Sequence, residues 1–235
     1  MAAPALLPPR CEFCSTRFMD IREALYTTRA MRRVRPDPIP EDVQMRILDA
    51  AIRAPSGGNG QQWRFMLVDD PAMRETLGEH YRFCIDQLWS TVYAEQTAAA
   101  ADPQSESDEQ FGRIINSVTW AQDNFATYPL LLFAFERGDT SGGSIYPAIW
   151  SAQLAARAEG VGSSLTTVLG YWKGDEVNEL LGVPTGEGWR MAGCVPMGYP
   201  TGRWGVAKRN PVHEVAYRNT WGSDIGFTID EPLWP

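Results

Sequence analysis

An unbroken apolar run lies between Pro129 and Glu136, in the stretch PLLLFAFE. A strand with one face in water alternates apolar and polar residues, whereas a strand covered on both faces reads as a continuous apolar run. We therefore expect residues 129–136 to form a central strand of a sheet.

Helical and extended patterns alternate around this run. Residues 146–160 are apolar on most sides, which predicts a deeply buried helix that ends at Gly160. Asp20 and Glu23 have the spacing of a capping box at the start of a helix. The segments expected to be helical are 20–34, 40–54, 71–89, 146–160 and 175–181, and those expected to be extended are 63–69, 163–169 and 190–200. This order predicts a single α+β or α/β domain.

Two segments are expected to lie outside the core. Residues 1–18 contain three prolines and are interpreted as a flexible leader, so that the domain spans residues 19–235. Residues 92–112 are rich in Ala, Gln and acidic residues and are interpreted as an exposed insertion. Binding loops and lids come from weakly packed segments, so the insertion is either a mobile lid or a solvated excursion without a role.

Composition excludes several classes of partner. The 235-residue chain is 44% hydrophobic and carries a formal charge of −8, which argues against nucleic acid or an anionic membrane as a partner. No apolar run is long enough for a transmembrane helix, and the first residues lack the layout of a secretory signal, so we expect a cytoplasmic protein. Cys11 and Cys14 form a CxxC, but no second close pair follows, and no metal site is expected.

Motifs for self-sufficient catalysis are missing. The sequence has no GxSxG, no phosphate-binding GxxxxGK[ST], no GxGxxG and no HExxH. Its two histidines, His80 and His213, have no Cys, Asp or Glu at metal spacing, and a histidine-based triad would have to use one of them. No side chains form a catalytic acid, base and nucleophile set. If the protein is an enzyme, we expect a cofactor to carry the chemistry.

One loop and two basic clusters suggest what such a cofactor would be. The loop APSGGNGQQW at 54–63 offers flexible glycines and the amides of Asn59, Gln61 and Gln62. The stretch 27–35, TTRAMRRVR, and the pair Lys208–Arg209 supply cations in an acidic protein, and arginine matches phosphate oxygens well. Together they fit a phosphate-bearing, ring-containing cofactor, although each cluster alone would more often be a solvated surface.

Three separated stretches resemble the FMN-dependent nitroreductases in the same order. They are RAMRRVRPDPIPEDVQMRILDAAIRAPSGGNGQQWRF, AARAEGVGSSLTTVLG and VPMGYPTGRWGVAKRNPV. The similarity runs from about residue 20 to residue 215, and Gln62 replaces the proline usual in that family. The resemblance implies an α+β nitroreductase-like fold, with a central, mostly antiparallel sheet flanked by helices. It also implies an intertwined homodimer with two FMN sites at the interface.

The resemblance also implies the cofactor contacts. Arg29 and Arg32 match residues that hold the phosphate and the pyrimidine edge, Lys208 and Arg209 match a basic tail at the phosphate, and residues 165–167 match a segment whose backbone N–H meets flavin N5. The complete expected set is Arg29, Ala30, Met31, Arg32, Pro55, Ser56, Gly57, Asn59, Gln61, Leu165, Thr166, Thr167, Lys208 and Arg209. No side chain is expected to be catalytic.

The implied activity is ping-pong hydride transfer through flavin N5. NAD(P)H would be the donor, with NADPH favoured over NADH, and a nitroaromatic or quinone-type small molecule would be the acceptor. Arg113 or Arg203 could read the 2′-phosphate of NADPH. An alternative is a flavin-binding or storage protein with little turnover.

Other activities of the same family fit the sequence less well. Relatives that break down flavin with oxygen carry an acidic residue where this chain has Ala30. Relatives that remove halogen from iodotyrosine use a Glu, a Tyr and a Lys on a lid, and residues 92–112 contain no lysine.

Overall fold

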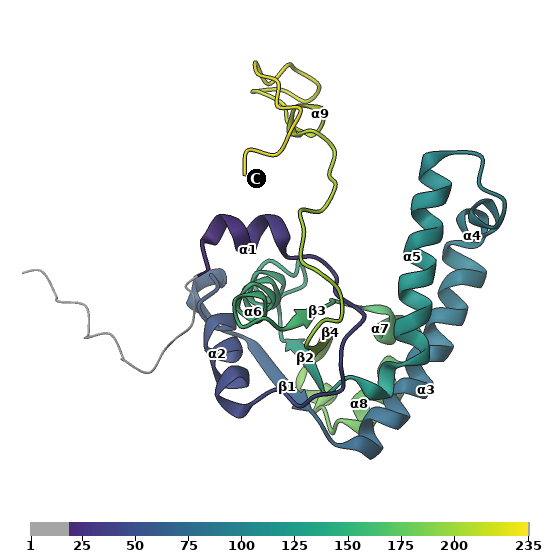
Figure 1. Ribbon diagram of the computed structural model, residues 1–235. Helices are drawn as coiled ribbons and strands as arrows, with labels where there is room; N and C mark the ends of the chain where they lie inside the picture. Colours follow the sequence, from purple (N-terminus) through teal and green to yellow (C-terminus); the bar gives the residue numbers. More distant parts are fainter. Residues whose placement is uncertain (1–18, 235) are drawn as a thin grey trace, which may run out of the picture.

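The structure is a computed structural model that describes residues 19–234. The expected leader and its CxxC lie outside these residues. A four-stranded antiparallel sheet forms the centre of the molecule, in the order β1-β2-β4-β3 (Figure 1). The strands are β1 (Trp63–Val68), β2 (Leu130–Glu136), β3 (Gly162–Ser163) and β4 (Arg190–Gly198). Every residue of β2 is buried, which confirms the central strand.

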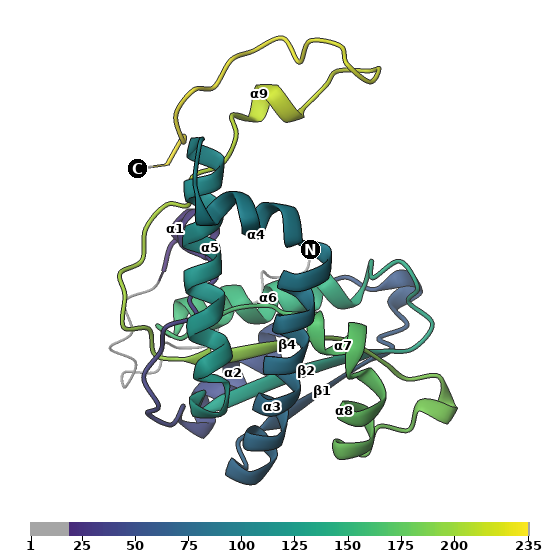
Figure 2. The same cartoon turned by 90° about the vertical axis from the view of Figure 1, so that its right-hand side faces the viewer.

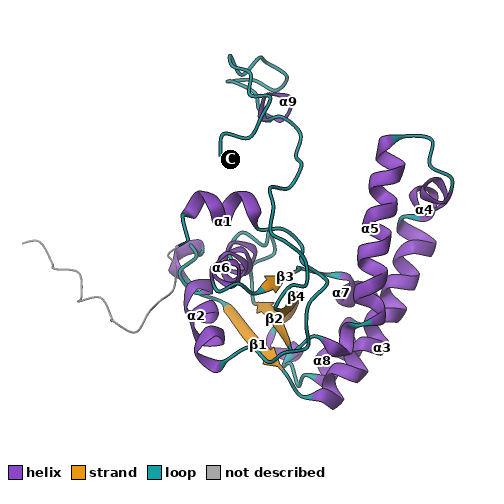
Figure 3. Ribbon diagram, viewed as in Figure 1, coloured by secondary structure: helices purple, strands orange, loops and turns teal. Residues whose placement is uncertain are grey.

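The side chains of β2 alternate between two apolar cores. Leu130, Leu132 and Ala134 pack in one core with helices α2 (Glu41–Ala51) and α6 (Ile145–Ala158). Leu131, Phe133 and Phe135 belong to the other core, with α3 (Pro71–Gln87), α5 (Glu106–Asp123), α7 (Val168–Trp172) and α8 (Gly174–Leu180). Helices therefore cover both faces of the sheet, and the fold is α+β (Figure 3).

Local sequence signals predict one helix end correctly and another incorrectly. Gly160 follows α6 with a φ of +74°, a left-handed conformation that glycine adopts without strain, as expected for a helix stop. Helix α1 (Ile21–Thr27) ends much earlier than residue 34. Asp20 caps it by accepting from the N–H of Arg22, but the expected capping box is wrong, because the Glu23 carboxylate pairs with Arg157.

Residues 88–123 form a helical excursion from the body (Figures 1 and 2). Helix α3 continues through a π-helical turn (Leu88–Val92) into α4 (Ala94–Ala101), and α5 returns the chain to the core. Helix α4 buries none of its residues, and Trp89, Tyr93 and Phe111 pack their rings together at its base. The segment 92–112 is exposed, and its role as a lid stays a prediction.

The C-terminal residues form an arm that projects from the body (Figures 1 and 2). The arm, residues 204–234, contains one short helix, α9 (Val212–Val215), and no strand. Its Trp221 and Leu233 side chains are 92% and 76% exposed. Short 3-10 turns at Gly57–Asn59, Phe125–Thr127 and Thr185–Glu187 complete the elements. None of the helices within residues 19–234 combines the length and the apolar character needed to cross a membrane.

Candidate functional site

The arginine-rich stretch is an extended strap across one end of the sheet. The arginine strap, residues 29–35, bonds to β3 through the Met31 N–H and the Ser163 carbonyl, 3.0 Å apart, and the Arg35 N–H donates to the Tyr199 carbonyl at 2.8 Å. This close approach requires glycine beneath it, because a Cβ at Gly162 would lie 2.9 Å from the Cβ of Met31. Backbone pairing with the sheet therefore replaces the helix expected for this stretch.

Three of the four arginines of the strap have no carboxylate partner among the described residues, whereas the fourth, Arg35, pairs with Asp37 at 3.2 Å. Arg29 and Arg33 are exposed, Arg32 is half-buried, and none of the three forms an ion pair within residues 19–234. Among residues 19–234 the Arg32 side chain donates only to the Ser117 hydroxyl, at 3.4 Å, whereas the Arg32 carbonyl accepts a 2.6 Å hydrogen bond from the hydroxyl of Tyr128. Hydrogen bonds thus hold the backbone of the strap, while the guanidinium groups of Arg29, Arg32 and Arg33 remain available to a ligand. Ala30 is exposed beside Ser163, and Met31 is buried.

The segment 165–167 runs along β4 next to the strap. Thr166 exchanges backbone hydrogen bonds with Cys194, at 2.8 and 2.9 Å, so the Thr166 N–H is already used. The N–H groups of Leu165 and Thr167 have no hydrogen-bond partner within the described residues. Gly193 makes room for the segment, because a Cβ there would lie 2.9 Å from Leu165 Cδ1. Two of the three expected N–H donors therefore stay free on this edge.

The loop 55–61 has an unusual backbone. Asn59 and Gln61 have φ angles of +54° and +48°, and Gly58 has a φ of +56°. Left-handed conformations are costly for residues with a Cβ and persist only where the surroundings support them. Here the Gln61 N–H donates to the Ser56 hydroxyl at 3.2 Å, and the Gly57 N–H donates to Ser144 at the start of α6, also at 3.2 Å.

A second support was not expected from the sequence. Arg137 donates from Nε and Nη2 to Oε1 of Gln62, at 3.1 and 2.8 Å, and its backbone N–H donates to the Gln62 carbonyl. The Arg137 guanidinium also lies over the Trp189 ring, 4.9 Å from its centroid. Gln62 in turn donates to the Gly60 carbonyl at 3.3 Å. These contacts hold the loop in place, and its polar residues, Asn59 and Gln61, remain exposed with Pro55.

The loop and the strap of one chain lie at opposite ends of the sheet. The strap meets the sheet at Ser163, which pairs with Met197, and Met197 pairs with Leu130 at the start of β2. The loop meets the sheet beside Glu136, at the other end of β2. Since an antiparallel strand rises about 3.4 Å per residue, the two motifs are about 20 Å apart along β2. The structure does not bring all the expected residues together within one chain.

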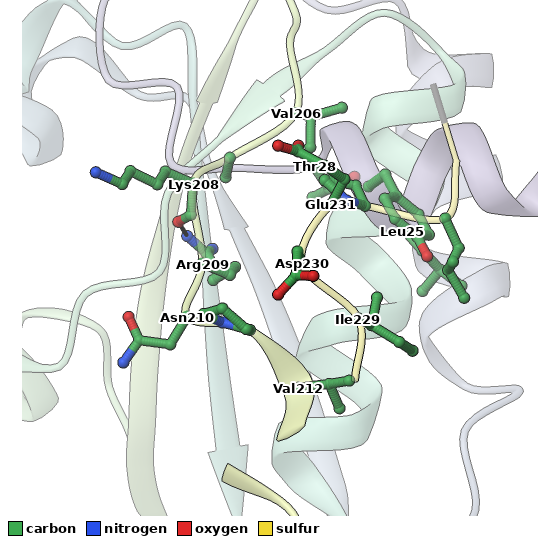
Figure 4. Close-up of a pocket in the computed structure, with 15 residues that line it drawn as sticks. Leu25, Thr28, Val206, Lys208, Arg209, Asn210, Val212, Ile229, Asp230 and Glu231 are labelled. Atoms are coloured by element: carbon green, nitrogen blue, oxygen red, sulfur yellow. Dashed lines mark hydrogen bonds between the residues drawn. The ribbon is translucent and has the colours of Figure 1, made fainter. Parts of the chain in front are cut away.

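The basic pair of the arm lines a cavity of about 840 Å³ between the arm and α1 (Figure 4). Thr28, directly before the strap, lies on its other side, and Asp230 faces Arg209 in the view of Figure 4. Within the part of the chain that the structure describes, the Arg209 side chain donates only to the Lys208 carbonyl, at 2.9 Å. Lys208 pairs with Glu106 at the start of α5, at 2.7 Å, and this contact lowers the pKa of Glu106.

The remaining reactive groups do not form a catalytic set. Cys84 and Cys194 are buried and free, and burial raises the pKa of Cys84 to about 11. Burial likewise raises the pKa of Tyr81 to about 12 and that of Tyr128 above its usual range. No group of three His, Cys, Asp or Glu side chains suited to a metal occurs among residues 19–234. These groups are poorly suited to act as bases or nucleophiles near neutral pH.

Two curated proteins are similar to this chain in sequence. A NADH dehydrogenase from Thermus thermophilus is 46% identical over 61 residues, which is 26% of this chain and 30% of that protein. A 5,6-dimethylbenzimidazole synthase from Rhodospirillum rubrum is 30% identical over 198 residues, covering 78% of this chain and 83% of that protein.

Solved structures share the fold. A nitroreductase with bound FMN from Bacteroides fragilis superposes with a TM-score of 0.58 at 24% identity, covering 81% of this chain and 94% of the other. The profile of the Nitroreductase family matches residues 25–199, which include the strap, the loop and the segment 165–167. The chain therefore belongs to the Nitroreductase family.

Proposed function

We propose that this protein is an FMN-dependent oxidoreductase that takes reducing equivalents from NAD(P)H and passes them to nitroaromatic or quinone-type acceptors. The observation that carries the proposal is the arginine strap beside the free N–H groups of Leu165 and Thr167. Unpaired cations next to free backbone donors suit a ligand that combines an anionic phosphate with a ring rich in acceptors.

The available donors fit FMN. In a protein of charge −8, three strap arginines without carboxylate partners in the described chain are suited to a phosphate and to an anionic ring edge. Arg29 and Arg209 would hold the phosphate, Arg32 would face the pyrimidine edge, and the N–H of Leu165 or Thr167 would face N5. Bound FMN would supply hydride transfer, which the side chains cannot.

The protein's own contribution is orientation and electrostatics. The Tyr128 hydroxyl fixes the Arg32 backbone, so that the guanidinium extends from a rigid base and stabilises negative charge on the reduced ring. No side chain is assigned the proton, since an open site admits water. Arg203, which is exposed, is the residue we assign to the 2′-phosphate of NADPH, because Arg113 pairs with Glu109.

We infer that the working form is a cytoplasmic homodimer whose sites combine two chains. A site that uses the strap at one end of β2 and the loop at the other takes the loop from a second copy. Tyr146 and Trp150 lie one helical turn apart on α6 and are both exposed, as are Trp221 and Leu233 on the arm. Exposed apolar and aromatic surface of this kind is typical of a subunit interface.

The first test is the flavin itself. Purified protein reconstituted with FMN should bind one FMN per chain, and NADPH should bleach its flavin absorbance within the time of a normal turnover. A protein that binds FMN but is not bleached by either nicotinamide would support the storage alternative.

The similarity to a 5,6-dimethylbenzimidazole synthase favours a second candidate, oxygen-dependent breakdown of the flavin. Ala30 counts against it, because relatives with that activity carry an acidic residue at this position, and a methyl group offers neither charge nor hydrogen bond. The reduced, FMN-loaded protein should be exposed to air and its flavin then extracted. Full recovery of FMN supports the reductase, and its loss supports flavin breakdown.

A further inference from the structure

Helix α6 buries one charged side chain, that of Arg157. Arg157 is only 6% exposed, and Ala152, Ala156 and Ile149 of the same helix are fully packed. Burial lowers the pKa of the Arg157 guanidinium below its ordinary value, although arginine keeps its charge in proteins. A buried cation needs a specific reason, because desolvation opposes it.

The contacts of Arg157 come from two other parts of the chain. Its Nε donates to the Thr27 hydroxyl at 2.9 Å, and its Nη2 donates to the Glu23 carboxylate at 3.2 Å. Both partners lie on α1. On another side the guanidinium stacks on the ring of Trp204, 4.2 Å from the centroid, at the base of the arm. One side chain thus joins α1, α6 and the arm.

Both segments that carry the proposed phosphate ligands begin at these contacts. Thr27 lies two residues before Arg29, and Trp204 lies four residues before Lys208. Stability alone does not account for the arrangement, because apolar residues of similar volume commonly replace buried ion pairs without loss. The planar guanidinium instead supplies directional contacts that an apolar side chain would not.

We propose that Arg157 is a positioning residue that fixes the end of α1 against the base of the arm, and so sets where Arg29 and the pair Lys208–Arg209 lie around the phosphate of the ligand. The inference rests on the proposed function, since that function places a phosphate there. Arg157 itself does not touch the ligand.

The test compares a flavin with a phosphate and one without. Fluorescence titrations of the apoprotein would give dissociation constants for FMN and for riboflavin with wild type, Arg157→Met and Arg157→Lys. Arg157→Met should weaken FMN binding by about tenfold or more, corresponding to a lost charge-assisted contact, and leave riboflavin binding within about twofold. Arg157→Lys keeps the charge but loses the planar fork, so it should show the same selective loss to a smaller extent.

Arg46→Met is the matched control. Arg46 also joins two helices, from α2 to Glu159 at 2.9 Å, but it is exposed and contacts neither the strap nor the arm. Its loss should leave both dissociation constants unchanged. Equal losses for FMN and riboflavin in the Arg157 variants, or no loss, would overturn the inference. Should Arg157→Met not fold, the ratio measured with Arg157→Lys decides in the same way. Failure of the wild type to bind either flavin would instead refute the proposed function.

Discussion

Two variants that each lose FMN binding should restore it when their subunits are mixed. Arg29→Ala removes a cation of the strap, and Asn59→Ala alters the loop about 20 Å away along β2. A lost charged contact to phosphate costs about 1.5–3 kcal/mol, so Arg29→Ala should weaken FMN binding by roughly ten- to a hundredfold. Asn59→Ala loses a polar ring contact and places alanine in a left-handed conformation, so its FMN binding should also weaken.

The magnitude of the recovery follows from the geometry. If each site takes its strap from one chain and its loop from the other, a mixed dimer contains one site with both changes and one site with neither. Random mixing of equal amounts makes about half of the dimers mixed, so about a quarter of all sites should regain wild-type affinity. Mixed dimers isolated through two different tags should have about half of their sites restored.

The assay is flavin absorbance of the mixed dimers at an FMN concentration between the dissociation constants of the wild type and the variants. Each parent variant alone provides the control, carried through the same mixing procedure. Mixed dimers that bind FMN as weakly as their parents would show that strap and loop act within one chain, and would refute the two-chain site.

Three further changes test separate parts of the site. Arg209→Ala should weaken FMN binding by about tenfold or more, because it removes a charged phosphate contact, and unchanged affinity in a fluorescence titration would remove the arm from the site. Gln62→Ala should reduce FMN affinity severalfold, since it releases the loop from Arg137, whereas Gln62→Pro should bind like wild type if rigidity is what the loop needs. The Asp139 carboxylate accepts hydrogen bonds from the N–H groups of Ile145 and Ser144, and these bonds hold its pKa below the usual range. The ionised carboxylate therefore stabilises the folded protein above about pH 4, and this stabilisation is lost as the pH falls through the lowered pKa. Asp139→Ala should therefore lower the free energy of unfolding at pH 7 by about 1 kcal/mol, measured as a lower midpoint in urea, and should lower it less at pH 3. Equal shifts of the midpoint at the two pH values would show that the charge is not the cause.

Local patterns of apolar residues in the sequence predict the main strand and helices of the fold. The apolar run of β2 predicts a strand covered on both faces, and this is confirmed. The deeply buried helix is confirmed only in part, because α6 packs one side into the core while its Tyr146 and Trp150 side chains are exposed. The helix expected through residue 34 is wrong because the strap gains backbone pairing with Ser163 and Tyr199, which lie more than a hundred residues away. No local pattern reports such a partner.

The expected site residues rest on sequence motifs, which do not give their arrangement in space. Arg29, Asn59 and Thr166 belong to recognisable motifs, but only the sheet register shows that strap and loop lie at opposite ends of β2. The register also shows that Cys194 already occupies the Thr166 N–H. Arg157 is the one basic residue in the expected helix 146–160, and that signal could have identified it. Gln62, the departure from the family's proline, contacts Arg137, which lies 75 residues away in the sequence, so no local pattern indicates its role.

The most direct test of the proposed function is an anaerobic absorbance titration of the FMN-loaded protein with NADPH and NADH separately, followed by a nitroaromatic compound. We predict that the yellow protein bleaches with a nicotinamide, more rapidly with NADPH, and recovers its colour when the nitroaromatic is added. A protein that cannot be loaded with FMN, or one whose bound flavin neither nicotinamide reduces, would contradict the assignment as an NAD(P)H-dependent oxidoreductase.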